Sequence, residues 1–127
     1  MLDFSRAAEF LVACQTSKPR VTYGLGQKVP FPNAVPGEDF TQVDCSGFIK
    51  EVIRRSTSPT VAFPDGSVTQ HDWVRARRFD VSTVQAGFAS DGIVRIAFLR
   101  PQDVPSRIGH VVLIAAGKTL ENSRLLN

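Results

Sequence analysis

The sequence has few of the residues that build a disulfide scaffold or a metal site. It contains only 2 Cys and 2 His in 127 residues. Two cysteines far apart in a chain without a secretory signal, Cys14 and Cys45, do not imply a disulfide. His71 and His110 form no HExxH motif, and there is no CxxC motif, so the sequence predicts no zinc site. We expect neither a metal nor another cofactor.

Long hydrophobic runs and a strong charge of one sign are also missing. No stretch approaches the roughly 20 consecutive apolar residues that span a bilayer, so we expect no transmembrane segment. The first residues lack the basic and apolar regions of a secretory signal. Lys and Arg number 15 against 12 Asp and Glu, without a basic stripe interleaved with aromatic residues. We therefore expect solvated charged faces and no nucleic-acid partner, although an anionic polymer as substrate stays compatible with this balance.

The remaining pattern fits a single α+β domain spanning residues 1–127. With 43% apolar residues, a chain of 127 can bury one core. Apolar residues at helical spacing predict helices over 3–15, 45–55 and 68–78, while residues 24–39 are rich in Gly and Pro and predict a long loop. Alternation and turn residues predict strands over 93–99, 110–115 and 119–123. Helices followed by an antiparallel sheet indicate an α+β fold.

Cys45 has a position that suits a thiol nucleophile. Asp44 is the expected N-cap of the second helix, so Cys45 begins it, where unpaired backbone N–H groups and the helix dipole stabilise a thiolate. Ser46 and Gly47 are small enough to admit a substrate carbonyl, and the backbone N–H of Cys45 would serve an oxyanion. The alternative is a buried cysteine at a helix start, with Asp44 only as a cap. Cys14 continues the apolar stripe of the first helix and is predicted to be inert packing.

His110 is the candidate base. It follows Gly109 and opens the apolar strand at 111–114, at the mouth of an element expected to pack on the core. A histidine available to a helix-terminal cysteine, with a polar residue on the next strand, gives the nucleophile, base and orienter of a cysteine hydrolase. A purely structural histidine at a strand end is the alternative. His71 lacks this context and is expected at the surface or as a helix cap.

The orienting residue is expected on the last predicted strand, where Glu121 and Asn122 are adjacent. Side chains alternate across a strand, so only one of the two shares the face of His110. A turn of two or four residues puts Glu121 on that face, and a turn of three residues puts Asn122 there. We favour Glu121 because two-residue hairpin turns are the commonest. Both side chains are able to orient an imidazole.

Together the motifs resemble the NlpC family of papain-like cell-wall cysteine peptidases, with CHAP-type amidases as related alternatives. The resemblance is carried by DCSGFI at 44–49, GHVVLI at 109–114 and GKTLEN at 117–122. It implies a papain-like core with N-terminal helices packed on a short antiparallel sheet. It also implies hydrolysis of an amide bond in peptidoglycan stem peptides, often between D-Glu and the diamino acid.

The resemblance also assigns roles to individual residues. Cys45 would be the nucleophile, His110 the base and then the acid, and Glu121 or Asn122 the orienter. The segment TYGLG at 22–26 resembles the family's upstream Tyr-Gly segment, whose tyrosine lines the site near the oxyanion. A buried ring in a glycine turn is the alternative for this tyrosine, Tyr23.

Substrate contacts are implied for residues on either side of the nucleophile. Asp44 and Ser46 match positions that help hold the amino end of the stem peptide. The segment PDGSVTQ at 64–70 weakly resembles the Pro-x-x-Ser…Gln stretch that follows the cysteine helix in such enzymes.

The sequence departs from the family pattern in three places. The proline-rich loop over 27–40 is longer than usual, which would reshape the substrate groove. The Pro-Gly-Asp segment that usually leads into the first strand is missing. Few residues follow Asn122, so we expect a sheet that is short, completed by a partner, or truncated.

The sequence leaves three functions open. The first is a peptidoglycan hydrolase, the second an acyltransferase or amidase with the same core acting on another amide or ester, and the third a catalytically silent phage or wall-binding structural module. Because peptidoglycan lies outside the cytoplasm and no export signal is predicted, the hydrolase would need delivery. A phage or secretion-system delivery partner, or an immunity protein, is then an expected partner.

Overall fold

The computed structural model describes residues 3–77, 94–103, 105–115 and 118–120. Its elements in chain order are α1 (Phe4–Thr16), β1 (Thr22–Tyr23), β2 (Gln42–Val43), α2 (Cys45–Ser56), α3 (Ser67–Ala76), β3 (Arg95–Leu99), the 3-10 helix η1 (Pro101–Asp103), β4 (His110–Ala115) and β5 (Lys118–Leu120). Three α-helices precede an antiparallel sheet. The α+β prediction is confirmed.

The two predicted N-caps define the starts of α1 and α2. The Asp3 carboxylate accepts hydrogen bonds from the backbone N–H groups of Ser5 and Arg6 at 2.9 and 3.4 Å. The Asp44 carboxylate accepts the N–H of Gly47 at 2.8 Å. Each cap satisfies donors that have no partner inside the helix, which fixes the first turn.

The third helix differs slightly from its prediction. It begins at Ser67, one residue early, and its cap position is Gly66 at φ 84°, which makes no side-chain cap bond. The expected last residue, Arg78, and the expected strand start, Ile93, lie outside the described residues.

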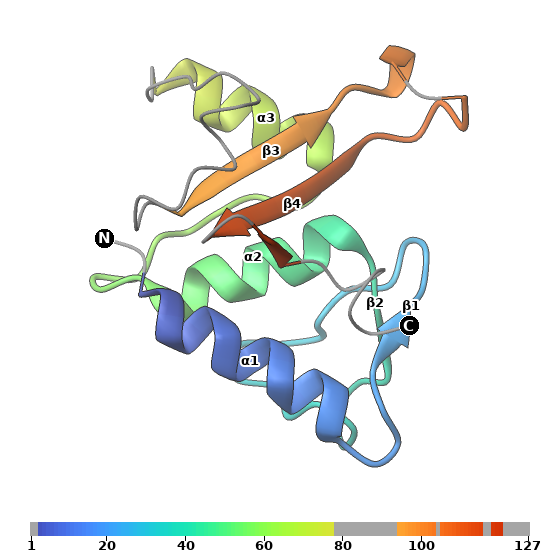
Figure 1. Ribbon diagram of the computed structural model, residues 1–127, viewed down its shortest axis with the longest axis vertical. Coiled ribbons are helices and arrows are strands. Elements are labelled where there is room, and N and C mark those ends of the chain that lie inside the picture. The colour runs from blue at the N-terminus through green and yellow to red at the C-terminus, as the bar shows by residue number, and fades with distance from the viewer. Residues whose placement is uncertain (1–2, 78–93, 104, 116–117, 121–127) are drawn as a thin grey trace.

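Helix α2 occupies the middle of the fold. Figure 1 shows α1 on one side of α2 and β4 on the other, with α3 beside β3. Most of α2 is therefore buried, including its polar residues Ser46, Glu51 and Ser56. This central position puts the start of α2, with Cys45, at a junction of several elements.

The main sheet has the order β3-β4-β5, with both pairs antiparallel. Leu99 pairs with His110 at one end of β4, and Ala115 pairs with Lys118 at the other. Residues 116 and 117 alone separate β4 from β5, because β5 begins at Lys118, one residue before the start predicted at 119. The connection therefore has the two-residue length that favours Glu121, and the predicted strand bounds, which left three residues between the strands, are corrected. Beyond Leu120, the predicted third strand lies outside the described residues.

A second, small sheet was not predicted. Strands β1 and β2 pair in parallel, with Thr22 opposite Gln42 and Tyr23 opposite Val43. Two-residue strands carry no alternation signal, and their pairing depends on a contact across the long loop. Over the loop itself, predicted for 24–39, the structure contains only turns and an isolated bridge between Pro36 and Phe40.

The hydrophobic core joins α1, α2 and β4. Its largest fully buried apolar side chains are those of Phe48, Ile49 and Leu113, and Cys14 belongs to the same cluster at 0% exposure. Burying each large side chain stabilises the fold by about 1.5–3 kcal/mol. The core therefore holds α2 against β4, which fixes the two elements that carry Cys45 and His110.

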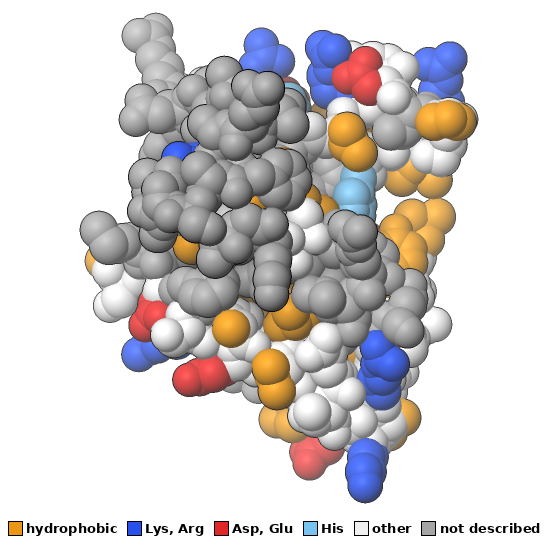
Figure 2. All heavy atoms as spheres, in the orientation of Figure 1, with side chains coloured by type: hydrophobic (Ala, Val, Ile, Leu, Met, Phe, Trp, Pro, Cys, Tyr) orange, Lys and Arg blue, Asp and Glu red, His pale blue; other side chains and the backbone are white. Residues whose placement is uncertain are grey.

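The visible surface mixes both charge signs. In Figure 2 the Lys and Arg side chains described on this face are dispersed and interspersed with Asp and Glu. Over the described part of the chain, none of the helices combines the length and apolar character needed to cross a membrane.

Candidate functional site

The parallel pair of β1 and β2 places Tyr23 beside the start of α2. Tyr23 lies opposite Val43, which directly precedes Asp44 and Cys45. The pairing is extended by the Gly24 N–H, which donates to the Val43 carbonyl at 3.2 Å, and by the Asp44 N–H, which donates to the Gln27 carbonyl at 2.8 Å. The alternative of a buried ring in a glycine turn does not describe this position, because Tyr23 ends a strand and is only half-buried, and the glycine turn follows it.

The pKa of Tyr23 responds to its burial and to the charges at the start of α2. Partial burial raises the pKa of Tyr23 above its ordinary value of 10.0, and the negative charges of a Cys45 thiolate and of Asp44 raise it further. The phenol is therefore protonated at neutral pH. Its hydroxyl is available there as a hydrogen-bond donor.

Cys45 is the first residue of α2 and has a free thiol. Its exposure is 6%, compared with 0% for Cys14, and neither residue forms a disulfide. The preceding residue, Asp44, caps the helix through its carboxylate and accepts the Phe48 N–H at its backbone carbonyl at 3.0 Å. The predicted position of Cys45 at a capped helix start is confirmed.

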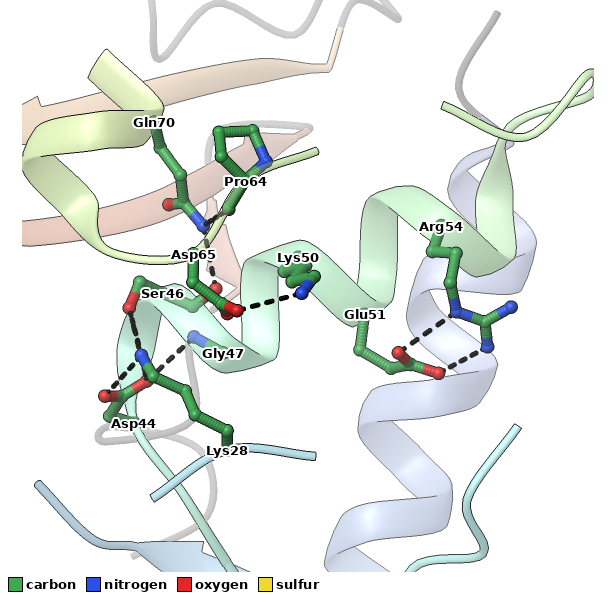
Figure 3. Close-up of polar contacts among 10 residues, drawn as sticks. All are labelled: Lys28, Asp44, Ser46, Gly47, Lys50, Glu51, Arg54, Pro64, Asp65 and Gln70. Atoms are coloured by element: carbon green, nitrogen blue, oxygen red, sulfur yellow. Dashed lines mark hydrogen bonds and ion pairs between the residues drawn. The ribbon is translucent and has the colours of Figure 1, made fainter. Parts of the chain in front are cut away.

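Lys28 completes a polar cluster around this helix start. Its Nζ lies 2.8 and 2.7 Å from the two Asp44 carboxylate oxygens and 2.8 Å from Ser46 Oγ. Figure 3 shows the ammonium seated between these two side chains. Sequence reasoning missed Lys28, because one lysine inside a proline-rich loop carries no periodicity or motif.

The first turn of α3 contacts both predicted motifs. Gln70, which has no exposed surface, donates through Nε2 to the Ser46 carbonyl and to the Pro64 carbonyl, both at 2.9 Å (Figure 3). At the other motif, a β-carbon added at Gly109 would lie only 2.6 Å from Ser67 Oγ, so the first residue of α3 lies close to the Gly109 backbone. One helical turn thus touches the residue after Cys45 and the residue before His110.

His110 begins β4, at the end of the strand that lies on the same side of Figure 1 as the start of α2. Val111 and Leu113 of β4 belong to the core cluster shared with α2. Regular alternation places His110 on the other face, with Val112 and Ile114. Glu121 and Asn122 lie outside the described residues.

The other histidine and cysteine have packing roles. The ring of His71 stacks on Phe98 with centroids 4.6 Å apart. His71 is therefore a half-buried packing residue inside α3, which corrects the expectation of a surface or capping residue. The prediction that Cys14 packs in the core is confirmed, and burial raises the pKa of its thiol to about 12.

Comparisons with known proteins add no relative to this picture. No protein-family model matches the sequence, and neither a curated protein nor a solved structure matches the chain. The interpretation of the site therefore depends on the residues themselves. What they assemble is a thiol at a capped helix start, a phenol on the strand that pairs with the segment before it, and a partly buried ion pair at the same helix start.

Proposed function

We propose that the protein is a cysteine hydrolase that cleaves an amide bond in peptidoglycan stem peptides. The observation that carries the proposal is the position of the Cys45 thiol, at the start of the central helix, beside the protonated Tyr23 phenol. The contact of the α3 turn with both motifs supports His110 as the base. The substrate class and the papain-like core come from the resemblance of the motifs to the NlpC family.

In the proposed reaction, His110 takes the proton of the Cys45 thiol, and the resulting thiolate attacks the carbonyl carbon and forms a C–S bond. The backbone N–H of Cys45 and the Tyr23 hydroxyl stabilise the oxyanion. His110 donates its proton to the leaving nitrogen as the C–N bond breaks. It then accepts a proton from the water that releases the acyl group and restores the thiol.

The proposal places a defined demand on β4. The His110 ring has to reach the Cys45 sulfur from the face of β4 that carries Val112 and Ile114, opposite the face on which Val111 and Leu113 share the core with α2. Among the two candidate orienters, the two-residue connection between β4 and β5 favours Glu121 over Asn122. Activity should therefore depend on Glu121 more than on Asn122.

Digestion of purified muropeptides, analysed by mass spectrometry, tests the proposal. The wild type should release products that have each gained one water, and Cys45→Ala and His110→Ala should release none. Cys14→Ala and His71→Ala are matched controls, because each removes the same residue type from a packing position and should retain activity.

The same assay separates the alternatives. An acyltransferase would give products joined to an added amine or alcohol acceptor in place of water. A silent structural module would give no product, and it would bind peptidoglycan equally well with and without the Cys45 thiol. Absence of any Cys45-dependent product from freshly reduced protein would sink the hydrolase proposal.

A further inference from the structure

The ion pair at the start of α2 joins the Lys28 ammonium to the Asp44 carboxylate. Lys28 Nζ contacts both Asp44 carboxylate oxygens and Ser46 Oγ within 2.8 Å, so it takes up three oxygen acceptors around one position. Asp44 Oδ1 also accepts the Gly47 N–H, and Ser46 Oγ lies 3.3 Å from the same oxygen. The acceptors that would bind a cation next to the nucleophile are thus already in use.

Neighbouring residues fix the position of the Lys28 side chain. The side chain of Asp44 is only 9% exposed and that of Lys28 is 36% exposed, so the ammonium covers a nearly buried carboxylate. Gly47 leaves room for the lysine stem, because a β-carbon there would lie 3.1 Å from Lys28 Cδ. The backbone immediately before Lys28 is fixed as well, by the bond from the Asp44 N–H to the Gln27 carbonyl.

We propose that Lys28 determines the charge specificity of the site, by occupying its cation position and excluding substrates with a free amino group there. This inference rests on the proposed hydrolase function. A substrate ammonium entering beside Asp44 would have to displace Lys28 or lie next to a like charge. The favoured substrate is therefore a stem peptide whose amino end is acylated, as it is when the peptide is still attached to the glycan.

Two matched stem peptides test this specificity, one with a free amino end and one with the same end acetylated. We expect the wild type to cleave the acetylated peptide at least about tenfold faster, because the free ammonium meets Lys28. Lys28→Met keeps the length of the stem without the charge, and it should reduce this preference to less than about threefold. Lys28→Arg should keep the preference.

A second lysine provides the control. Lys50 Nζ pairs with Asp65 at 2.9 Å on the exposed side of α2, so Lys50→Met removes a lysine and its ion pair without touching the cluster. Lys50→Met should keep the wild-type preference. Equal cleavage of the two peptides by the wild type, or the same ratio in Lys28→Met, would overturn the role of Lys28 while leaving the hydrolase proposal intact.

A labelling experiment separates the two proposals because it needs no hydrolysis. In a Cys14→Ala background, Cys45 is treated with a cationic aminoethyl methanethiosulfonate and with the neutral methyl methanethiosulfonate, and intact mass is followed over time. Lys28→Met should increase the cationic-to-neutral rate ratio by about fivefold, since Asp44 is then free to attract the cation. An unchanged ratio would reject the inference whether or not stem peptides are cleaved.

Discussion

Cys14 and Cys45 are both free and both buried, yet they have opposite surroundings. Cys14 lies in the interface of α1 with α2, at 0% exposure among apolar side chains. Cys45 lies at the start of α2 with a charged and hydrogen-bonded cluster on both sides of it, formed by Lys28, Asp44 and Ser46. Burial alone therefore does not distinguish a packing thiol from a candidate nucleophile.

The difference is electrostatic. Burial raises the pKa of Cys14 from 9.0 to about 12, because a thiolate there would lose its hydration. The charge of Arg55 lowers it and that of Glu51 raises it, and neither outweighs burial. Cys45 instead begins a helix that Asp44 caps, and its two chain neighbours, Asp44 and Ser46, both bind the Lys28 ammonium. A buried cysteine is a candidate nucleophile when its site offers polar groups that replace the hydration of a thiolate.

Selective alkylation is the largest expected contrast between the two thiols. A thiol with a pKa of about 12 in place of 9.0 holds about a thousandfold less thiolate at neutral pH. We expect iodoacetamide at about pH 6 to modify Cys45 at least about a hundredfold faster than Cys14. Peptide mapping after timed quenching measures both rates in one sample. Equal rates in the folded protein would remove the reason for choosing Cys45.

The second prediction concerns Glu51, whose charge is one of those that act on Cys14. This carboxylate, 6% exposed, accepts hydrogen bonds from Arg54 at 2.5 Å and from Arg55 at 2.6 Å. Glu51→Gln leaves both guanidinium groups without their charged partner. We expect it to lower the free energy of unfolding by about 3 kcal/mol at neutral pH, measured by urea denaturation.

The pH dependence of that loss follows from the pKa of Glu51. Burial raises this pKa, but hydrogen bonds from Arg54 and Arg55 outweigh burial and hold it below its ordinary value of 4.5. The stabilisation is therefore full above pH 4.5 and declines as the pH falls through the lower native value. The wild type and Glu51→Gln should converge in stability in acid. A constant difference down to the acid limit would contradict this account.

Tyr23→Phe tests the surroundings of Cys45, and its expected effect on catalysis is smaller. If the hydroxyl stabilises the oxyanion, its removal should reduce kcat/KM by about tenfold, with the backbone donor remaining. Because the pKa of Tyr23 lies above 10.0, the hydroxyl stays protonated, and the rate ratio should be constant from about pH 6 to pH 9. Intact activity in Tyr23→Phe would assign the ring to packing only.

The sequence was sufficient for the local features of this site. Asp44 before an apolar stripe predicted a capped helix start at Cys45, and alternation predicted the strand 110–115 with the bounds that β4 has. These features depend on neighbouring residues, so a single sequence contains them. The same is true of Cys14, whose helical spacing with Leu11 indicated a core position.

The missed features are contacts between distant segments. Tyr23 pairs with Val43, two residues before Cys45, in a parallel pair of two-residue strands that closes across the long loop. Lys28 reaches Asp44 across the same loop, and His71 finds Phe98 on a strand that follows much later in the chain. Tertiary pairing of this kind leaves no local periodicity, so the Lys28–Asp44 ion pair emerged only from the fold.

Replacing each cysteine with serine compares the two sites directly, and the expected difference in the free energy of unfolding is the smallest of these effects. Cys14→Ser puts a hydroxyl into an apolar, fully buried site, where its available partner is the Phe10 carbonyl one turn earlier in α1. Such a bond offsets part of the desolvation penalty, so we expect a loss of about 1 kcal/mol in the free energy of unfolding. Cys45→Ser should change stability by less than about 0.5 kcal/mol, because polar groups already surround that position.

Denaturant titration of the two variants at one pH measures this difference in stability. An activity assay should rank the two variants in the opposite order. Cys14→Ser should hydrolyse normally while being less stable, and Cys45→Ser should be stable while inactive. Equal destabilisation by both substitutions would mean that the two sites solvate a hydroxyl equally well. The polar cluster of Lys28, Asp44 and Ser46 would then not distinguish Cys45 from a packing residue, and the electrostatic basis for choosing it as nucleophile would be lost.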